Sequence, residues 1–263
     1  MLHLTITTCQ APLAEPMVAA VAGYLGDALG ATLTLRTDLP WQERQLALDA
    51  GAIDIGWICG PPYVQRAAMA APPIELLAAP IQAAPRYAGL PRYFSDVVVR
   101  RESRYASFAD LRAARWAYNE RTSHSGWYLF RAHLAALGET ERYFAALTES
   151  GAHAESLRMV CAGEADASAI DSTVLELALR ERPALARQIR VVATLGPSPM
   201  PPWVVRRSLD AAIKVRLRSA LTAMHNDLLG RALLAAHQLA GFAAVADSDY
   251  DPIRRMMELA GRL

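Results

Sequence analysis

The sequence predicts an α/β protein made of two units, one of them inserted into the other. The first observation is that strand-like alternation and helix-like periodicity follow one another along most of the 263 residues. The second is that this series begins anew in the middle of the chain. The third is that no low-complexity linker separates the two series. The chain is therefore expected to pass between the units along continuous strands.

Strands and helices are expected to alternate in the first third of the chain. Val18, Val21 and Leu25 recur at helical spacing, and the pattern stops at Gly30, a residue type that commonly ends helices. A later helix opens with Pro61 and Pro62, which suit a first turn. The expected strands are 2–8, 31–37 and 52–58, and the expected helices are 12–29, 41–51 and 61–69.

The rest of the chain repeats this alternation. Strands are expected at 93–103, 115–119, 165–171, 188–195 and 202–208, and helices at 153–164, 172–183, 213–224, 249–261 and from Ser125 onward. The strands near 95–101 and 189–206 are the expected crossings between the units. They place residues 1–94 and 203–263 in one lobe and 95–202 in the other. An interlobe cleft is where ligands usually bind in such a protein, with a hinge at the crossings.

Charge and hydrophobicity exclude two classes of partner. Lys and Arg number 27 against 26 Asp and Glu, which gives a net charge of +1. This balance, without an arginine cluster interleaved with aromatic residues, argues against a nucleic-acid surface. The apolar runs end before the roughly 20 residues that a bilayer span needs, so no membrane insertion is expected.

The N-terminal segment, MLHLTITTCQAP, has neither the basic start nor the apolar stretch of a secretory signal. It predicts a cytoplasmic protein, or a periplasmic one if the chain begins at a methionine added after removal of a leader.

Cysteine spacing and common motifs supply no catalytic or metal chemistry. Cys9, Cys59 and Cys161 are widely separated and odd in number, which argues against a disulfide framework and against a metal site. The GxGxxG, GxxxxGK[ST], HExxH and GxSxG patterns are missing from the sequence. An enzyme is therefore the less favoured class, and no catalytic residue, metal or cofactor is assigned.

The segment YNERTSHSGWYLF places several hydroxyl groups at a strand-to-helix junction. Thr122, Ser123 and Ser125 precede a helix whose first N–H groups lack internal partners. One hydroxyl would satisfy a helix cap. Three hydroxyls followed by Gly126 would suit an oxyanion at the positive end of the helix. A nucleophilic serine activated by His124 is the third interpretation and the weakest, because adjacent residues seldom meet in the required geometry.

Other polar and aromatic residues fall at positions where a ligand contact and a structural role both remain open. His153 precedes a predicted helix, where it is either a capping residue or a hydrogen-bond donor to an anion. Asp171 ends a buried strand, where open α/β sheets place ligand groups. Tyr63 follows Gly-Pro-Pro in the first turn of its helix.

Five segments, taken together, resemble the phosphonate-, phosphite- and phosphate-binding proteins of ABC importers, within the type II periplasmic-binding-protein fold. They are AIDIGWICGPPYV, FSDVVVRRES with SFADLRAARWAYNE, TSHSGWYLFRAHL, SGAHAESLRMVCAGEADASAID and GPSPMPPWVVRRSL. Their order and spacing agree over roughly residues 50 to 225. The resemblance implies a two-lobed fold with two crossover strands and an interlobe cleft.

The resemblance also implies a set of ligand contacts. In the family a Ser/Thr-Ser-Gly helix start binds the oxyanion, which places Thr122, Ser123 and Ser125 at the anion with His124 inserted among them. The resemblance also implies that Asp171 is the acidic residue that contacts an amine or a phosphate proton of the ligand. The remaining implied contacts are Tyr63, Tyr93 and His153. This sequence departs from the family where Asn119-Glu120 replaces the usual Asp-Pro.

These implications lead to one favoured function and two others. The favoured function is binding of a small oxyanion such as phosphate, phosphite or an alkylphosphonate, as the solute-binding component of an ABC importer or as a cytoplasmic relative. An ABC permease is the expected partner in the first case. The alternative is a cytoplasmic enzyme of cofactor biosynthesis, of the thiamine-pyrimidine or menaquinone type, on the same fold. A cytoplasmic sensor ranks last.

Overall fold

The computed structural model describes residues 2–261, which form two compact units. The first unit contains the chain up to Arg92 together with Pro199–Asp251. The second contains Tyr93–Ser198 together with residues 252–261. The chain therefore passes between the units at 92/93, at 198/199 and at 251/252.

The first unit is built on a mixed sheet with the order β11-β4-β10-β3-β1-β2. β1 pairs in parallel with β2 and β3, whereas β10 and β11 pair antiparallel to their neighbours. The strands are β1 (Leu2–Thr8), β2 (Ala31–Leu35), β3 (Ile55–Trp57), β4 (Ile74–Gln82), β10 (Trp203–Arg206) and β11 (Leu239–Ala243). The parallel core is the βαβ arrangement that the alternating sequence predicted.

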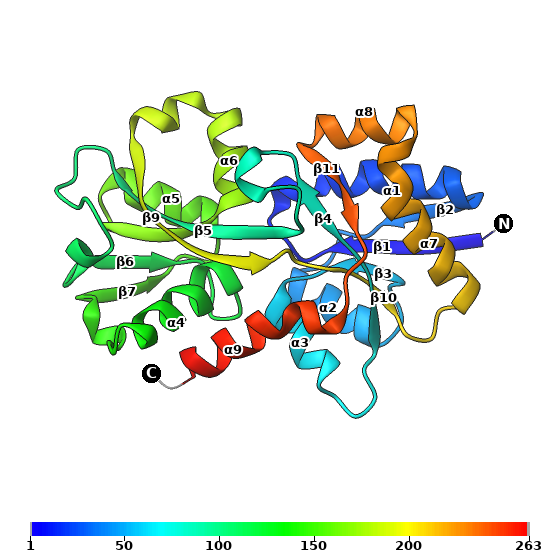
Figure 1. Ribbon diagram of the computed structural model, residues 1–263, viewed down its shortest axis with the longest axis horizontal. Helices are drawn as coiled ribbons and strands as arrows, with labels where there is room; N and C mark the ends of the chain where they lie inside the picture. Colours follow the sequence, from blue (N-terminus) through cyan, green and yellow to red (C-terminus); the bar gives the residue numbers. More distant parts are fainter. Residues whose placement is uncertain (1, 262–263) are drawn as a thin grey trace. The chain divides into compact units, whose positions relative to one another are not determined.

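Helices cover both faces of this sheet. They are α1 (Glu15–Leu29), α2 (Trp41–Asp49), α3 (Gly60–Ala67), α7 (Ala211–Ala223) and α8 (Leu228–Ala236). The helical spacing of apolar residues buries Val21 of α1 in one cluster with Leu217 of α7 and Leu234 of α8. Figure 1 shows α1 and α8 on one side of β1, with α2 and α3 on the other.

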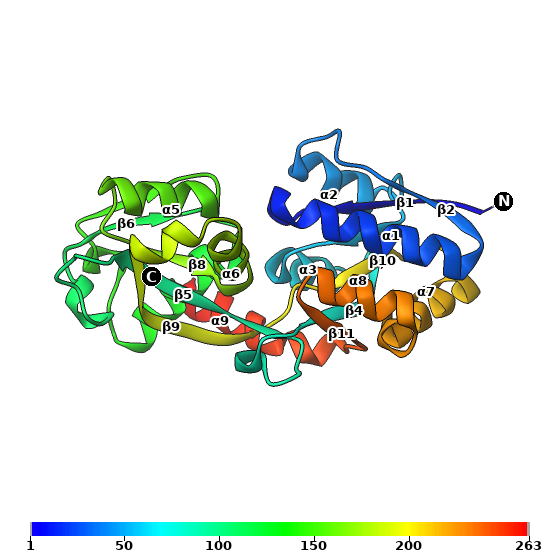
Figure 2. The ribbon, with the colours of Figure 1, turned by 90° about the horizontal axis from the view of Figure 1, so that it is seen from above.

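The second unit carries a sheet with the order β7-β6-β8-β5-β9. β6 pairs in parallel with β7 and β8, and β5 pairs antiparallel with β8. The strands are β5 (Arg92–Arg100), β6 (Arg115–Tyr118), β7 (Ala146–Glu149), β8 (Ala167–Asp171) and β9 (Ile189–Pro199). β5 and β9, the strands that enter and leave this unit, run side by side at one edge (Figure 2).

Successive side chains along the strands of the second unit pack into two separate hydrophobic clusters. Its helices are α4 (Leu129–Ala136), α5 (His153–Ala162), α6 (Ser172–Glu181) and α9 (Asp251–Ala260). Val97 and Val99 of β5 join the cluster that contains Phe130 of α4, whereas Val98 joins the cluster that contains Leu157 of α5. Because successive side chains point to opposite faces, one apolar run supplies both layers. Figure 1 shows α4 and α5 on opposite sides of β6.

The C-terminal segment differs from the expected division of the chain. Residues 203–263 were expected to stay together in the first lobe, but the chain from Pro252 groups with the second unit. α9 buries Ile253 and brings the Met256 sulfur to 3.9 Å from the Ser198 hydroxyl. An amphipathic last helix with an apolar face to bury accounts for this placement.

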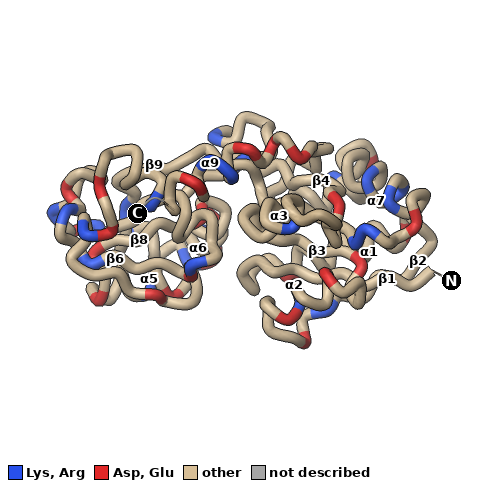
Figure 3. The backbone as a smooth tube through the Cα atoms, turned by 90° about the horizontal axis from the view of Figure 1, so that it is seen from below, with Lys and Arg blue, Asp and Glu red and all other residues tan. Residues whose placement is uncertain are grey.

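Basic and acidic positions are interspersed along both units (Figure 3). Within residues 2–261 no helix combines the length and the apolar character that a membrane crossing requires.

Replacing Phe130 by alanine tests the packing of the second unit. The ring is fully buried, with its centroid 5.2 Å from that of Trp116 and 5.5 Å from that of Trp127. Phe130→Ala is expected to lower the free energy of unfolding by about 3–5 kcal/mol, measured by urea unfolding. Leu137→Ala, at an exposed position just after the same helix, is the control. A comparable loss in both variants would contradict the assignment.

Candidate functional site

The loop between β6 and α4 holds half of the predicted ligand residues. We call residues 119–126 the hydroxyl loop. Its helix begins with a π turn over His124–Tyr128, which Ser123 caps by accepting a hydrogen bond from the Gly126 N–H at 3.1 Å. The carbonyl oxygen of Ser123 accepts from the N–H groups of Trp127 and Tyr128. The N–H groups of His124 and Ser125 then lie at the open end of the helix, where they have no acceptor within it.

Gly126 is required by its surroundings. A Cβ at this position would lie 1.8 Å from Oδ1 of Asn119 and 3.2 Å from Cε1 of His153. Both neighbours are buried, so neither has room to withdraw. The absence of a side chain at Gly126 thus allows the loop, the end of β6 and the start of α5 to meet.

Ser125 and His153 form the central contact of the site. The Ser125 hydroxyl lies 3.0 Å from Nε2 of His153, the first residue of α5. The Ser95 hydroxyl on β5 donates to the Ser125 carbonyl oxygen at 2.8 Å. All three side chains are buried. Three chain segments therefore fix the position of one hydroxyl group.

His153 is neutral at physiological pH. Burial lowers its pKa to about 4, because desolvation disfavours the charged ring. Among the described residues its Nδ1 has no hydrogen-bond partner. An unpaired buried N–H is costlier than an unpaired acceptor, so the proton belongs on Nε2. Nε2 then donates to Ser125, and the Ser125 O–H is left to donate to a ligand.

His124 points away from the other hydroxyl-loop residues. Its Nε2 lies 3.0 Å from the Ser198 hydroxyl on β9, and its ring centroid lies 6.3 Å from that of Tyr93. The side chain is completely buried, and burial lowers its pKa to about 3. His124 therefore cannot activate a neighbouring serine, as the nucleophile hypothesis required.

Asp171 lies beside the same site. It pairs with Ser95 across the antiparallel β5–β8 ladder and caps α6 by accepting from the N–H and hydroxyl groups of Thr173, both at 2.8 Å. Burial raises the pKa of this carboxyl to about 6, and the nearby Asp96 carboxylate adds to the rise. The carboxyl group thus changes its charge near neutral pH.

Two other predicted site residues, Thr122 and Tyr63, lie apart from the Ser125–His153 contact. Thr122 is exposed and hydrogen-bonds the side chain of Glu120, whose pKa is raised mainly by burial. Tyr63 belongs to the first unit, where its hydroxyl donates to Asp247 at 2.7 Å and its ring packs against Tyr250. Ligand contacts from Thr122 and Tyr63 stay predictions, as do those from the other predicted site residues.

Sequence reasoning missed Ser95, Asn119 and Ser198 as parts of the site. Ser95 and Ser198 lie on strands that were expected only as crossings, and Asn119 was noted only as a departure from a family pattern. The available signal was a polar residue within an apolar strand, as Ser95 is in FSDVVV. Such residues are usually placed by a hydrogen-bond partner that the sequence does not identify.

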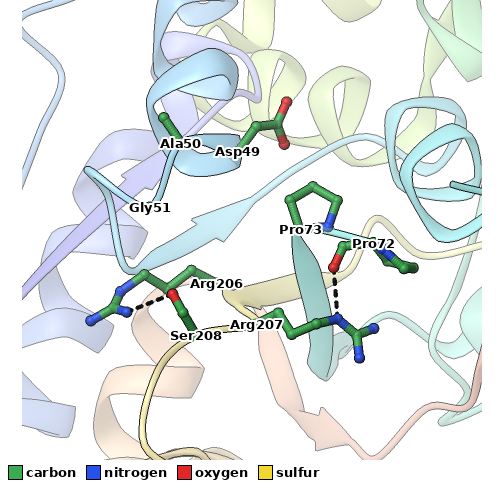
Figure 4. A pocket seen from close by; sticks show the side chains of 8 residues that line it. All are labelled: Asp49, Ala50, Gly51, Pro72, Pro73, Arg206, Arg207 and Ser208. Carbon is green, nitrogen blue, oxygen red and sulfur yellow. Dashed lines mark hydrogen bonds between the residues drawn. The ribbon is translucent and has the colours of Figure 1, made fainter. Parts of the chain in front are cut away.

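A hollow in the first unit lies beside Arg206, Arg207 and Ser208, with a volume of about 300 Å³ (Figure 4). Its arginines already have partners. Arg206 donates to Asp54 at 2.6 Å and to Ser208, and Arg207 donates to the carbonyl oxygen of Pro72. Because both arginine side chains already donate within the protein, the hollow is a weaker candidate for an anion site than the presence of two arginines would indicate. Among residues 2–261 no group of three or more His, Cys, Asp or Glu side chains could hold a metal ion.

The fold and the buried neutral donors at a helix start describe a ligand-binding α/β protein. The family model for phosphonate periplasmic substrate-binding proteins of ABC transporters matches residues 6–250. The chain therefore belongs to this family of substrate-binding proteins. The predicted resemblance and the predicted two-lobed α/β fold class are confirmed.

Solved structures show the same fold. A binding-protein component of an ABC phosphonate transporter from Pseudomonas aeruginosa aligns over 99% of this chain and 87% of its own, with 17% identity and a TM-score of 0.84. PhnD1 from Prochlorococcus marinus, in complex with methylphosphonate, aligns over 99% of both chains with 16% identity and a TM-score of 0.84. The aliphatic sulphonate-binding protein SsuA from Escherichia coli aligns over 99% and 87%, with 16% identity and a TM-score of 0.64.

Gly126→Ala tests the close approach at the hydroxyl loop. The added Cβ would overlap Oδ1 of Asn119, so we expect a loss of about 2–3 kcal/mol in the free energy of unfolding. Gly23→Ala is the matched control, because nothing lies within 4 Å of a Cβ in that helix and alanine is the better helix former. Thermal denaturation of both variants decides the point. Equal melting temperatures would contradict the packing described.

The raised pKa of Asp171 predicts a pH-dependent cost. The carboxyl group holds its proton more tightly in the folded chain, so its stabilisation is complete below pH 3.8 and is lost as the pH rises through about 6. Asp171→Asn preserves the helix cap and removes the ionisation. We expect it to raise the free energy of unfolding by about 1–2 kcal/mol at pH 7.5 and to leave it unchanged below pH 4.

Urea unfolding at the two pH values measures this difference. Asp210→Asn, at the exposed N-cap of α7, is the control and is expected to give no stabilisation at pH 7.5. A lower free energy of unfolding for Asp171→Asn than for the wild type at pH 7.5 would contradict the direction assigned to the Asp171 pKa shift.

Proposed function

We propose that this protein binds a small phosphonate-type oxyanion, such as methylphosphonate, phosphite or phosphate, through the hydroxyl loop of its second unit. The observation that carries the proposal is the Ser125–His153 contact at the start of a helix whose first N–H groups lack helical acceptors. In the proposed complex the Ser125 hydroxyl and the N–H groups of His124 and Ser125 donate to anion oxygens. Family membership supports an oxyanion as the ligand.

Neutral donors suit this ligand. His153 carries no net charge at physiological pH, and Ser123 and Ser125 contribute only dipoles. A helix N-terminus adds a partial positive charge that favours an anion. Such a site binds through fixed hydrogen bonds rather than through ion pairs, so its selectivity depends on where the ligand presents acceptors.

Asp171 adds a second requirement, which is a protonated ligand oxygen. Its ionised carboxylate would repel an unprotonated phosphonate oxygen, but would accept a hydrogen bond from a P–OH group. A pKa of about 6 allows the carboxyl group to be present in either form near neutral pH. We therefore expect the ligand to bind as a monoanion above this pH, with its proton shared toward Asp171.

In the cell this activity would serve import. The family is described as periplasmic, which supports a periplasmic location and an ABC permease as the partner of the loaded protein. The cofactor-biosynthesis enzyme that the sequence left open has no support in the comparisons. The Ser125–His153 pair also lacks an orienting acid, because Nδ1 of His153 has no partner among residues 2–261.

Titration calorimetry with methylphosphonate, phosphite and phosphate tests the proposal, with methanesulfonate as an isosteric anion that carries no proton near neutral pH. Ser125→Ala is expected to weaken methylphosphonate binding at least about tenfold, because one donor to a buried oxygen is lost. Ser168→Ala removes a hydroxyl that is buried without a partner in the same unit, and its affinity should be unchanged. Binding of none of the phosphorus anions by the wild-type protein would overturn the proposal.

A further inference from the structure

His124 lies where the segments that connect the two units reach the second unit. Tyr93 is the first residue of this unit, and its ring packs beside the His124 ring. Ser198 is the last residue before the chain leaves again, and its hydroxyl meets His124 Nε2 at 3.0 Å. Met256 lies on α9, just after the third passage, and its sulfur lies 3.9 Å from the same hydroxyl.

The hydrogen-bond directions in this cluster are consistent with one another. Nδ1 of His124 has no partner among the described residues, so the single proton of the neutral ring belongs on Nε2. Nε2 then donates to the Ser198 oxygen, and the Ser198 hydroxyl donates to the Met256 sulfur. The full burial of His124 and the near-full burial of Ser198 exclude water from both groups.

His124 also belongs to the hydroxyl loop itself. Its backbone N–H is one of the two left at the open start of the helix, and Ser125 follows it directly. The side chain and the backbone of one residue thus face different partners. The backbone faces the candidate ligand site, and the imidazole faces the connecting segments.

We propose that His124 is a positioning residue that links occupancy of the hydroxyl loop to the segments through which the chain enters and leaves the second unit. The inference rests on the proposed function, since the loop is taken to bind the oxyanion. An anion that pulls on the N–H groups of His124 and Ser125 would shift the loop backbone. Because the imidazole is held by Ser198 and packed on Tyr93, that shift reaches the ends of β9 and β5.

Two substitutions at His124 separate the hydrogen bond from simple packing. His124→Gln places an amide N–H near the position of Nε2 and keeps the donor to Ser198. His124→Leu fills similar space and removes the donor. Ser198→Ala removes the acceptor from the other side. Ser168→Ala deletes a buried hydroxyl that has no hydrogen-bond partner among the described residues, and it is the control for a buried serine substitution in the same unit.

Hydrogen exchange measured by mass spectrometry, with and without methylphosphonate, gives the readout, and calorimetry gives the affinity. In the wild type we expect ligand to protect the hydroxyl loop and also the ends of β5 and β9. His124→Leu and Ser198→Ala should bind about tenfold more weakly and lose the protection at the strand ends. His124→Gln and Ser168→Ala should retain both. The inference would be overturned if His124→Leu and Ser198→Ala kept the wild-type protection at the strand ends. It would also be overturned if His124→Gln lost that protection.

Failure of the proposed function is distinguishable from failure of this inference. If the wild type binds none of the phosphorus anions, the ligand assignment falls, and exchange in the ligand-free protein tests the link. Faster exchange at the hydroxyl loop and at the strand ends in Ser198→Ala than in Ser168→Ala would still support the positioning role. Equal exchange in the two variants would overturn it.

Discussion

The backbone of Gly126 approaches the side-chain oxygen of Asn119 so closely that no Cβ fits between them, and this approach sets the form of the hydroxyl loop. The helix that follows starts with a wider π turn, and the N–H groups of His124 and Ser125 at its open end have no helical acceptors. Ser125 is then held between Ser95 and His153. The packing of a single glycine thus orients the donors on which the proposed chemistry depends.

The electrostatic character of the site follows from burial rather than from charge pairing. Desolvation keeps His124 and His153 neutral and raises the pKa of Asp171, so the same physical cause produces donors on one side and a proton-sensitive acceptor on the other. If the proposed function holds, we expect such a site to distinguish anions by the placement of their protons. Ligand binding would require little movement of these side chains, because a backbone element already fixes each of them.

The sequence was sufficient for the fold class, because that depends on local patterns, whereas the ligand contacts of the hydroxyl loop stay predictions. The apolar run with Val97, Val98 and Val99 predicted β5, and the cluster of hydroxyls before Gly126 predicted a helix start. β4 escaped prediction because Pro80 interrupts its apolar run, and β7 because it is short and mostly exposed. The partners Ser95 and Ser198 lie far from the loop in sequence, so only the folded chain brings them to it. The placement of α9 depends equally on tertiary packing, which no local pattern specifies.

The first strand and the last helix belong to different units. β1 begins at Leu2 in the first unit, whereas α9 belongs to the second. Labels attached near Leu2 and near Gly261 would therefore sit on different units. Such a pair would report on each unit separately.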